Sequence, residues 1–192
     1  MYKLNSLKCG LPVLTATSKG TESVTVHVFA GAGSRYETQK ERGISHFLEH
    51  MFFKGGKTYK NAAEVSMAID SFGGSFNAFT GKEYAGYYVK ITDSHTETAC
   101  DVLSDMLLHA TLPEEEAKKE SGVIIEELRM YEDTPMYKAG WDFEELMYGD
   151  QPLGWDTIGI EETIKAVDHN SLMAHKNLLY TPDNMVLVFA GN

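Results

Sequence analysis

Hydrophobic residues recur along this chain with two different periods, and these periods predict its strands and helices. Alternation of apolar and polar side chains is typical of a half-buried strand, and a repeat of three to four residues is typical of an amphipathic helix. Strands are predicted at residues 2–7, 12–17, 24–30, 75–80, 83–91 and 185–190. Helices are predicted at residues 43–53, 61–72, 96–111, 113–131, 137–147, 161–167 and 169–180. Because strands and helices do not alternate regularly, the pattern indicates an α+β domain with a sheet layer and a helix layer.

The most informative stretch is the apolar run at residues 43–53, which contains two histidines and a glutamate and is followed by a glycine pair. His46, Glu49 and His50 stand at i, i+3 and i+4, so their side chains share one face of the predicted helix. The order His-x-x-Glu-His predicts two imidazoles that bind a divalent metal such as zinc, with the glutamate as general base on the bound water. The alternative is that the three groups are ordinary polar residues that are hydrogen-bonded within the core.

The helix predicted at residues 113–131 carries further candidate carboxylates. Glu120 and Glu127 are seven residues apart and nearly in line on a partly apolar face, whereas Glu126 points away from that line. A charge on an inward face needs a partner. The helix alone favours the interpretation that both are solvated acids, because this is the commoner fate of glutamates on helices.

Composition limits the classes of partner and the compartment. The 192 residues, 43% of them hydrophobic, suffice for one domain with a sizeable core. The formal charge of -11 argues against nucleic acid and anionic membranes as partners. Two cysteines without metal-type spacing and an N-terminus without an apolar leader predict a reducing, cytoplasmic location. No run approaches the roughly 18 consecutive apolar residues of a membrane span.

Three motifs, in the same order, resemble the pitrilysin/insulinase family of zinc peptidases, which includes the mitochondrial processing peptidases and their bacterial relatives. They are the runs at residues 42–55, 73–80 and 120–128, and the similarity extends over nearly the whole chain. The resemblance implies a two-layer domain in which helices cover a mostly antiparallel, mixed sheet. It also implies that residues 1–192 form one catalytic, N-terminal domain of a clamshell, a zinc-dependent endopeptidase that hydrolyses peptide bonds in peptides or unfolded segments.

The resemblance assigns roles to residues at the matching positions. His46 and His50 are expected to bind one zinc ion, and Glu49 is expected to activate its water. Glu127 is expected to be the third ligand, because the gap after His50 is similar to the family's, with Glu126 as the alternative. Glu120 is expected to lie behind the ligands and to orient one of them.

The resemblance also predicts the substrate contacts and the partner. Asn77, Ala78 and Phe79 match an edge strand that pairs with the backbone of an extended peptide substrate. Family members have two or four such domains around a chamber, so a second peptidase-like half is expected, in a homodimer or a heterodimer. Without that half, the monomer is expected to have weak or no peptidase activity.

Two other interpretations remain open on the sequence. A lyase resembling S-ribosylhomocysteine lyase would share the His-x-x-Glu-His helix, but it needs a cysteine as third ligand. A non-catalytic subunit would only bind peptides or scaffold an assembly, and it would have no need to keep the four candidate site residues. The other five histidines have no ligand spacing and are expected to be ordinary surface or partly buried residues.

Overall fold

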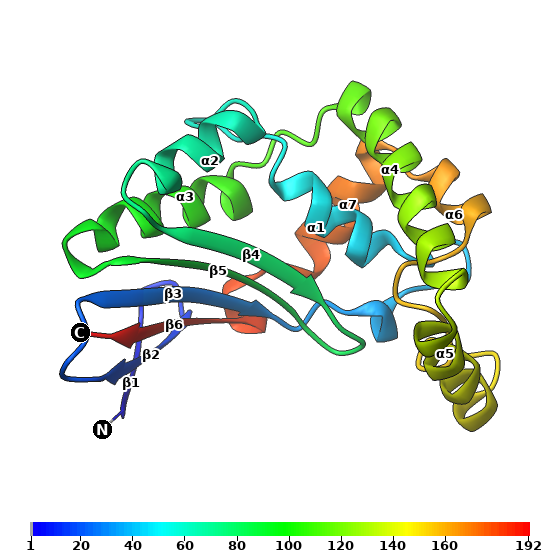
Figure 1. Cartoon of the computed structure of the whole chain (residues 1–192), viewed down its shortest axis with the longest axis horizontal. Helices are drawn as coiled ribbons and strands as arrows, with labels where there is room; N and C mark the ends of the chain where they lie inside the picture. Colours follow the sequence, from blue (N-terminus) through cyan, green and yellow to red (C-terminus); the bar gives the residue numbers. More distant parts are fainter. Residues whose placement is uncertain (1) are drawn as a thin grey trace.

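The computed structural model describes residues 2–192, which form one six-stranded sheet with helices on one of its faces (Figure 1). The strands are β1 (Tyr2–Ser6), β2 (Pro12–Thr17), β3 (Ser23–Ala30), β4 (Ser75–Thr80), β5 (Ala85–Thr92) and β6 (Met185–Gly191). They lie in the order β1-β2-β6-β3-β5-β4, and every neighbouring pair is antiparallel except β2 and β6, which run parallel. The predicted α+β class, with a mostly antiparallel mixed sheet, is therefore confirmed.

The helices are α1 (Ile44–Phe52), α2 (Ala62–Asp70), α3 (Thr96–Leu108), α4 (Glu114–Glu132), α5 (Pro135–Tyr148), α6 (Glu161–Ala166) and α7 (His169–Leu179). Helix α3 packs on β3 and β5, and α2 packs beside it, whereas α1 contacts β4, α4 and α7. Helices α4, α5 and α6 extend away from the sheet (Figure 1). None of the helices in the described part of the chain combines the length and apolar character that a membrane crossing requires.

The predicted elements are all present, and the differences lie at their ends. Strand β5 begins at Ala85 rather than at residue 83, because residues 81–84 form a turn in which the N–H of Gly81 donates to the C=O of Tyr84. The helix predicted to reach residue 72 ends at Asp70. Phe72 lies beyond the end of α2, 41% exposed and stacked on His95.

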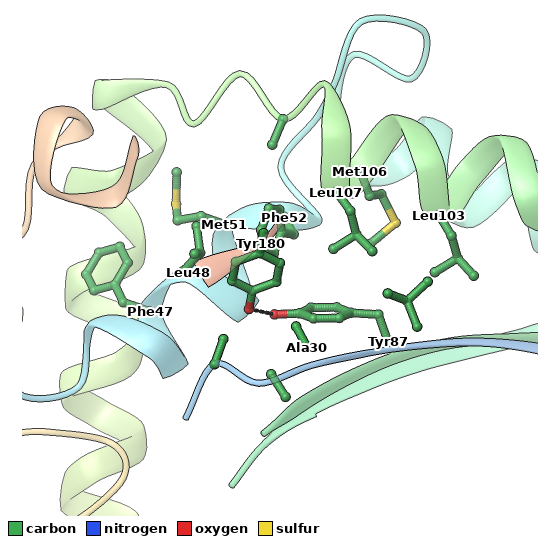
Figure 2. Close-up of a cluster of buried hydrophobic side chains, with 14 of the residues drawn as sticks. Ala30, Phe47, Leu48, Met51, Phe52, Tyr87, Leu103, Met106, Leu107 and Tyr180 are labelled. Atoms are coloured by element: carbon green, nitrogen blue, oxygen red, sulfur yellow. Dashed lines mark hydrogen bonds between the residues drawn. The ribbon is translucent and has the colours of Figure 1, made fainter. Parts of the chain in front are cut away.

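The core lies between the sheet and helices α1, α3 and α7. Every second side chain of β3 is buried, and α1 buries its apolar face in the same core. Tyr87 of β5 and Tyr180, which follows α7, meet here with their hydroxyl oxygens 2.6 Å apart (Figure 2). Phe52 of α1 packs edge-on against both rings, at centroid distances of 5.3 and 5.0 Å. Helix α1 is therefore anchored to the sheet through the core.

The opposite face of the sheet carries no helix within the described residues (Figure 1). One row of paired residues crosses all six strands on this face: Leu4, Leu14, Val188, His27, Tyr88 and Asn77. Phe29 stacks on His27 at a centroid distance of 3.8 Å, and Phe79 packs edge-on against His27 at a centroid distance of 6.0 Å. A sheet face in contact with water usually carries polar side chains. This row is instead apolar over β1, β2 and β6, whereas the next row on the same face carries Thr25, Lys90 and Ser75 on β3, β5 and β4.

Candidate metal centre

Helix α1 presents its two histidines because its other face is fixed in the core. Its fully buried side chains include Phe47, Leu48, Met51 and Phe52, each 0% exposed. Burying side chains of this size stabilises the fold by about 2 kcal/mol each. The helical period then leaves His46, Glu49 and His50 on the side of α1 that faces α4 and β4.

Helix α4 brings Glu127 to the two histidines. Glu127 Oε2 lies 3.4 Å from His50 Nε2 and 3.9 Å from His46 Nε2. The two imidazole rings are 4.6 Å apart between centroids, and one ligand atom from each of the three residues lies within 4.8 Å of the others. Two nitrogens and one carboxylate oxygen thus converge on one point between two helices that are distant in sequence.

The protonation states of the three groups differ. Burial and the nearby His50 lower the pKa of His46 to about 4, so its imidazole is neutral at pH 7. Burial opposes protonation of His50 as well, but its hydrogen bonds to Glu120 and Glu127 outweigh burial and raise its pKa to about 9. The hydrogen bond with His50 lowers the pKa of Glu127 despite partial burial. The carboxylates of Glu120 and Glu127 therefore favour a positive charge at His50.

Glu120 orients His50 from behind. Its Oε1 lies 2.9 Å from His50 Nδ1, and its Oε2 lies 2.5 Å from Lys54 Nζ. Glu120 is only 6% exposed, and its bonds to His50 and Lys54 lower its pKa against the effect of burial. Metal-binding histidines commonly donate their second ring N–H to a carboxylate in this way. The ring nitrogen Nδ1 of His46, in contrast, is buried without a hydrogen-bond partner among the described residues.

Glu49 lies beside these groups without belonging to them. The hydroxyl of Thr80, at the end of β4, donates to Glu49 Oε2 at 2.5 Å. Burial raises the pKa of Glu49, and the Thr80 hydrogen bond opposes that shift. Glu49 is therefore a fixed carboxylate whose affinity for a proton is greater than that of an exposed glutamate.

One open cavity of about 430 Å³ contains the candidate centre. Its lining residues are His46, Glu49, His50, Ala78, Phe79, Thr80, Glu127, Tyr131, Tyr137, Trp141, Thr157 and Ile158. Tyr131 packs edge-on against Tyr137 and Trp141, at centroid distances of 4.9 and 5.5 Å, and this aromatic group forms one wall. Ala78 and Phe79 of β4 also line the cavity, whereas the exposed Asn77 uses its Oδ1 to accept the N–H of Ala78 at 2.9 Å.

The geometry decides between the candidates for the third ligand that the sequence left open. The side chain of Glu126 is 72% exposed and pairs with Arg129 at 2.5 Å, away from the two histidines. Cys9 is exposed, and Cys100 lines a separate apolar cavity of about 240 Å³. The cysteine ligand that the lyase interpretation requires is therefore not at this site, and that interpretation is wrong.

Sequence reasoning did not find three features of the site: the Thr80 hydroxyl on Glu49, the Lys54 ammonium on Glu120 and the aromatic wall. Only Tyr131 had a local signal, because it follows Glu127 by one helical turn. The Thr80 and Lys54 contacts join segments that are far apart in the chain. Tyr137 and Trp141 meet Tyr131 across the bend between α4 and α5, which the period within either helix does not indicate.

Comparison with known proteins gives the same picture. A model of the insulinase family, peptidase family M16, matches residues 12–159. The chain is 43% identical over 192 residues to the uncharacterized zinc protease YmxG of Bacillus subtilis, which covers 100% of this chain and 47% of that protein. A protease from Helicobacter pylori has a similar structure, with a TM-score of 0.95 and 27% identity over 100% of this chain and 46% of that one.

The first half of the periplasmic protease PqqL from Escherichia coli is also similar, with a TM-score of 0.89 and 25% identity over 99% of this chain and 42% of that one. The chain spans about half the length of the curated relatives it matches. The family match includes both histidines of α1, the glutamate between them and the carboxylate that α4 brings to them. The chain therefore belongs to the insulinase family of peptidases, family M16, as a domain of the zinc-protease type.

Proposed function

We propose that this chain is the catalytic, N-terminal half of a zinc endopeptidase that hydrolyses peptide bonds in peptides or unfolded segments. The observation that carries the proposal is the convergence of His46, His50 and Glu127 in one open cavity that also holds Glu49. Three protein ligands with room for a fourth are typical of catalytic zinc sites, whereas structural sites are closed by four.

The donor atoms suit zinc. Donors about 2.0 to 2.1 Å from a tetrahedral zinc ion lie roughly 3.3 Å from one another. The His50–Glu127 distance of 3.4 Å is close to that value, and the His46–Glu127 distance of 3.9 Å needs only a small adjustment. Imidazole nitrogen with carboxylate oxygen is an established ligand set for this metal. When bound, zinc would supply a Lewis acid that polarises a carbonyl and acidifies water.

Glu49 is the proton carrier in this proposal. Its raised pKa and its place in the cavity allow it to take a proton from the attacking water and to deliver it to the leaving amine. The Thr80 hydroxyl holds Oε2 of Glu49 and leaves its other oxygen for the water. An intact carboxylate at this position favours catalysis over a subunit that only binds peptides.

Strand β4 provides the substrate-binding edge. It is the outermost strand and pairs only with β5, so alternate backbone N–H and C=O groups face away from the sheet. An extended peptide that adds to this edge would lie along Ala78 and Phe79, with its scissile carbonyl next to the histidines. The Asn77 side chain, which holds the N–H of Ala78, would yield that donor to the peptide backbone.

The sheet face without helices gives a place for a further half. The relatives of this chain are about twice as long as the chain itself, and no described helix covers the row of residues from Leu4 to Asn77. Contact with a second peptidase-like half, in the same polypeptide or in a homodimer or heterodimer, would bury this face. The cytoplasmic location stays a prediction from the sequence, and the similar PqqL is a periplasmic protease.

Metal analysis and peptide hydrolysis test the proposal together. We expect about one zinc ion per chain in the wild type and in Glu49→Gln, and little zinc in His50→Ala. In the species assembled with the second half, hydrolysis of a quenched fluorescent peptide should fall at least about 100-fold in Glu49→Gln, because general-base catalysis is lost. A wild-type protein that binds no zinc, or a Glu49→Gln protein that cleaves at the wild-type rate, would contradict the proposal.

The need for a second half is tested by measuring size and activity on the same preparation. The monomeric fraction should show weak or no turnover, and activity should follow the assembled species. Robust turnover by a demonstrably monomeric chain would show that no second half is needed.

A further inference from the structure

The N-terminus of α1 is held by a carboxylate that the zinc proposal does not use. Glu37 follows the short 3-10 turn at Ser34–Tyr36 and is only 5% exposed. Its Oε2 accepts the N–H of Gly43 at 2.8 Å, and its Oε1 accepts the N–H of Ser45 at 2.9 Å. The residue after Ser45 is His46. Glu37 therefore binds the backbone immediately before a candidate zinc ligand.

Helix α1 has no cap of its own at this end. Its N-cap residue is Gly43, at φ 87°, and an added Cβ there would meet the backbone of Ile158 and Gly159. No acidic residue lies in its first turn. The first N–H groups of a helix have no partner within the helix, and a carboxylate is favourable there because of the helix dipole. Glu37, in the loop that leads into α1, supplies the acceptors that position 43 cannot.

A second contact holds the same residue from another direction. The hydroxyl of Ser45 lies 3.0 Å from Nε2 of His175 on α7, and both groups are buried. The backbone of Ser45 is thus fixed by Glu37, and its side chain is fixed by α7. These two contacts restrain the start of α1 on two sides.

The two zinc ligands on α1 differ in what orients them. His50 is aimed by Glu120, which binds its second ring nitrogen. The corresponding nitrogen of His46 has no hydrogen-bond partner among the described residues, so no side chain aims that ring. Its direction must then come from the backbone that carries it. We propose that Glu37 is a positioning residue for the zinc site, which sets the direction of His46 by clamping the first turn of α1.

Glutamine at position 37 is the appropriate test. It keeps the size of the side chain but offers one acceptor oxygen, and its NH₂ group would face the second backbone N–H. Glu41→Gln is the matched control, because Glu41 is in the same loop and its carboxylate accepts from Thr38 instead of from α1. Both variants remove one negative charge from this loop, so a long-range charge effect on zinc would be the same in both.

The first measurement is the dissociation constant for zinc by competition with a chromophoric chelator at pH 8. We expect Glu37→Gln to raise it about tenfold, as the loss of an outer partner commonly does, and Glu41→Gln to leave it unchanged. If Glu37→Gln does not fold, Glu37→Asp replaces it, with a smaller rise expected because one N–H contact remains within reach. An unchanged constant, or equal rises in the Gln variants at 37 and 41, would overturn the inference.

The second measurement separates positioning from simple stabilisation. In the zinc-free protein, Glu37→Gln should shift the ring resonances of His46 in ¹⁵N spectra more than those of His50, and Glu120→Ala should do the reverse. A cap that only stabilises the helix would move both rings equally or neither, and that result would refute the inference. The inference rests on the proposed zinc site, but the two fail differently. A wild type that binds no zinc would refute both the zinc site and the role of Glu37. Equal zinc binding by wild type and Glu37→Gln would refute only the role of Glu37.

Discussion

Removal of one hydroxyl from the Tyr87–Tyr180 pair should destabilise the fold, and removal of both should cost less than the sum. The two hydroxyl oxygens are 2.6 Å apart, and the side chains are 0% and 9% exposed. In Figure 2 they point at each other across the core between β5 and the end of α7. Tyr87→Phe leaves the hydroxyl of Tyr180 buried without this partner, which costs about 1 to 3 kcal/mol. Tyr180→Phe leaves the opposite orphan and has a similar cost.

The double variant should lose less stability than the sum of the two single variants, because neither hydroxyl is then left buried and unpaired. We expect a coupling free energy of about 1 to 2 kcal/mol from the double-mutant cycle. Urea unfolding followed by circular dichroism, with a chelator present so that zinc does not contribute, measures each free energy of unfolding. Tyr88→Phe on the same strand is the control and should change stability by less than about 0.5 kcal/mol. Strictly additive costs for the two substitutions would refute this reading of the pair.

Three further predictions concern the site and its surroundings. Glu120→Ala should raise the dissociation constant for zinc about 10- to 100-fold, because His50 loses the group that orients it. The control Glu126→Ala, which only removes an exposed pair with Arg129, should leave this constant unchanged. Gly56→Ala should lower the free energy of unfolding by about 1 to 3 kcal/mol, because an added Cβ meets the Asp105 carboxylate that binds three backbone N–H groups. Gly122→Ala, where no atom lies within 4 Å, should instead stabilise α4 by about 1 kcal/mol. Changes of the same sign for the two variants in urea unfolding would contradict this prediction. Burial raises the pKa of Glu37 from 4.5 to about 7, so the folded state binds a proton that the unfolded chain releases, and this contribution to stability is present in full below pH 4.5 and is lost as the pH rises through about 7. The contribution amounts to about 3 kcal/mol. A wild type whose stability relative to Glu37→Gln is the same at pH 5 and pH 8 would show that Glu37 does not titrate in this range.

The sequence alone determined the elements and one face of the site. Residues 46, 49 and 50 share a helix face because the helical period is a local property, and the burial of Phe47 and Met51 on the other face follows from the same period. The strands of the sheet were likewise readable from alternation within each segment. The order of those strands was not, because the insertion of β6 between β2 and β3 depends on pairings across the whole chain.

Only the tertiary structure decided which groups meet at α1. A helix of glutamates offers several candidates, and the packing angle of α4 against α1 brings Glu127 and Glu120 to the histidines and leaves Glu126 in solvent. The contacts of Thr80 with Glu49 and of His175 with Ser45 also join segments that no local pattern connects. Periodicity states which side of an element faces inward, but the partner on the other side is set by long-range packing, which a local pattern does not contain.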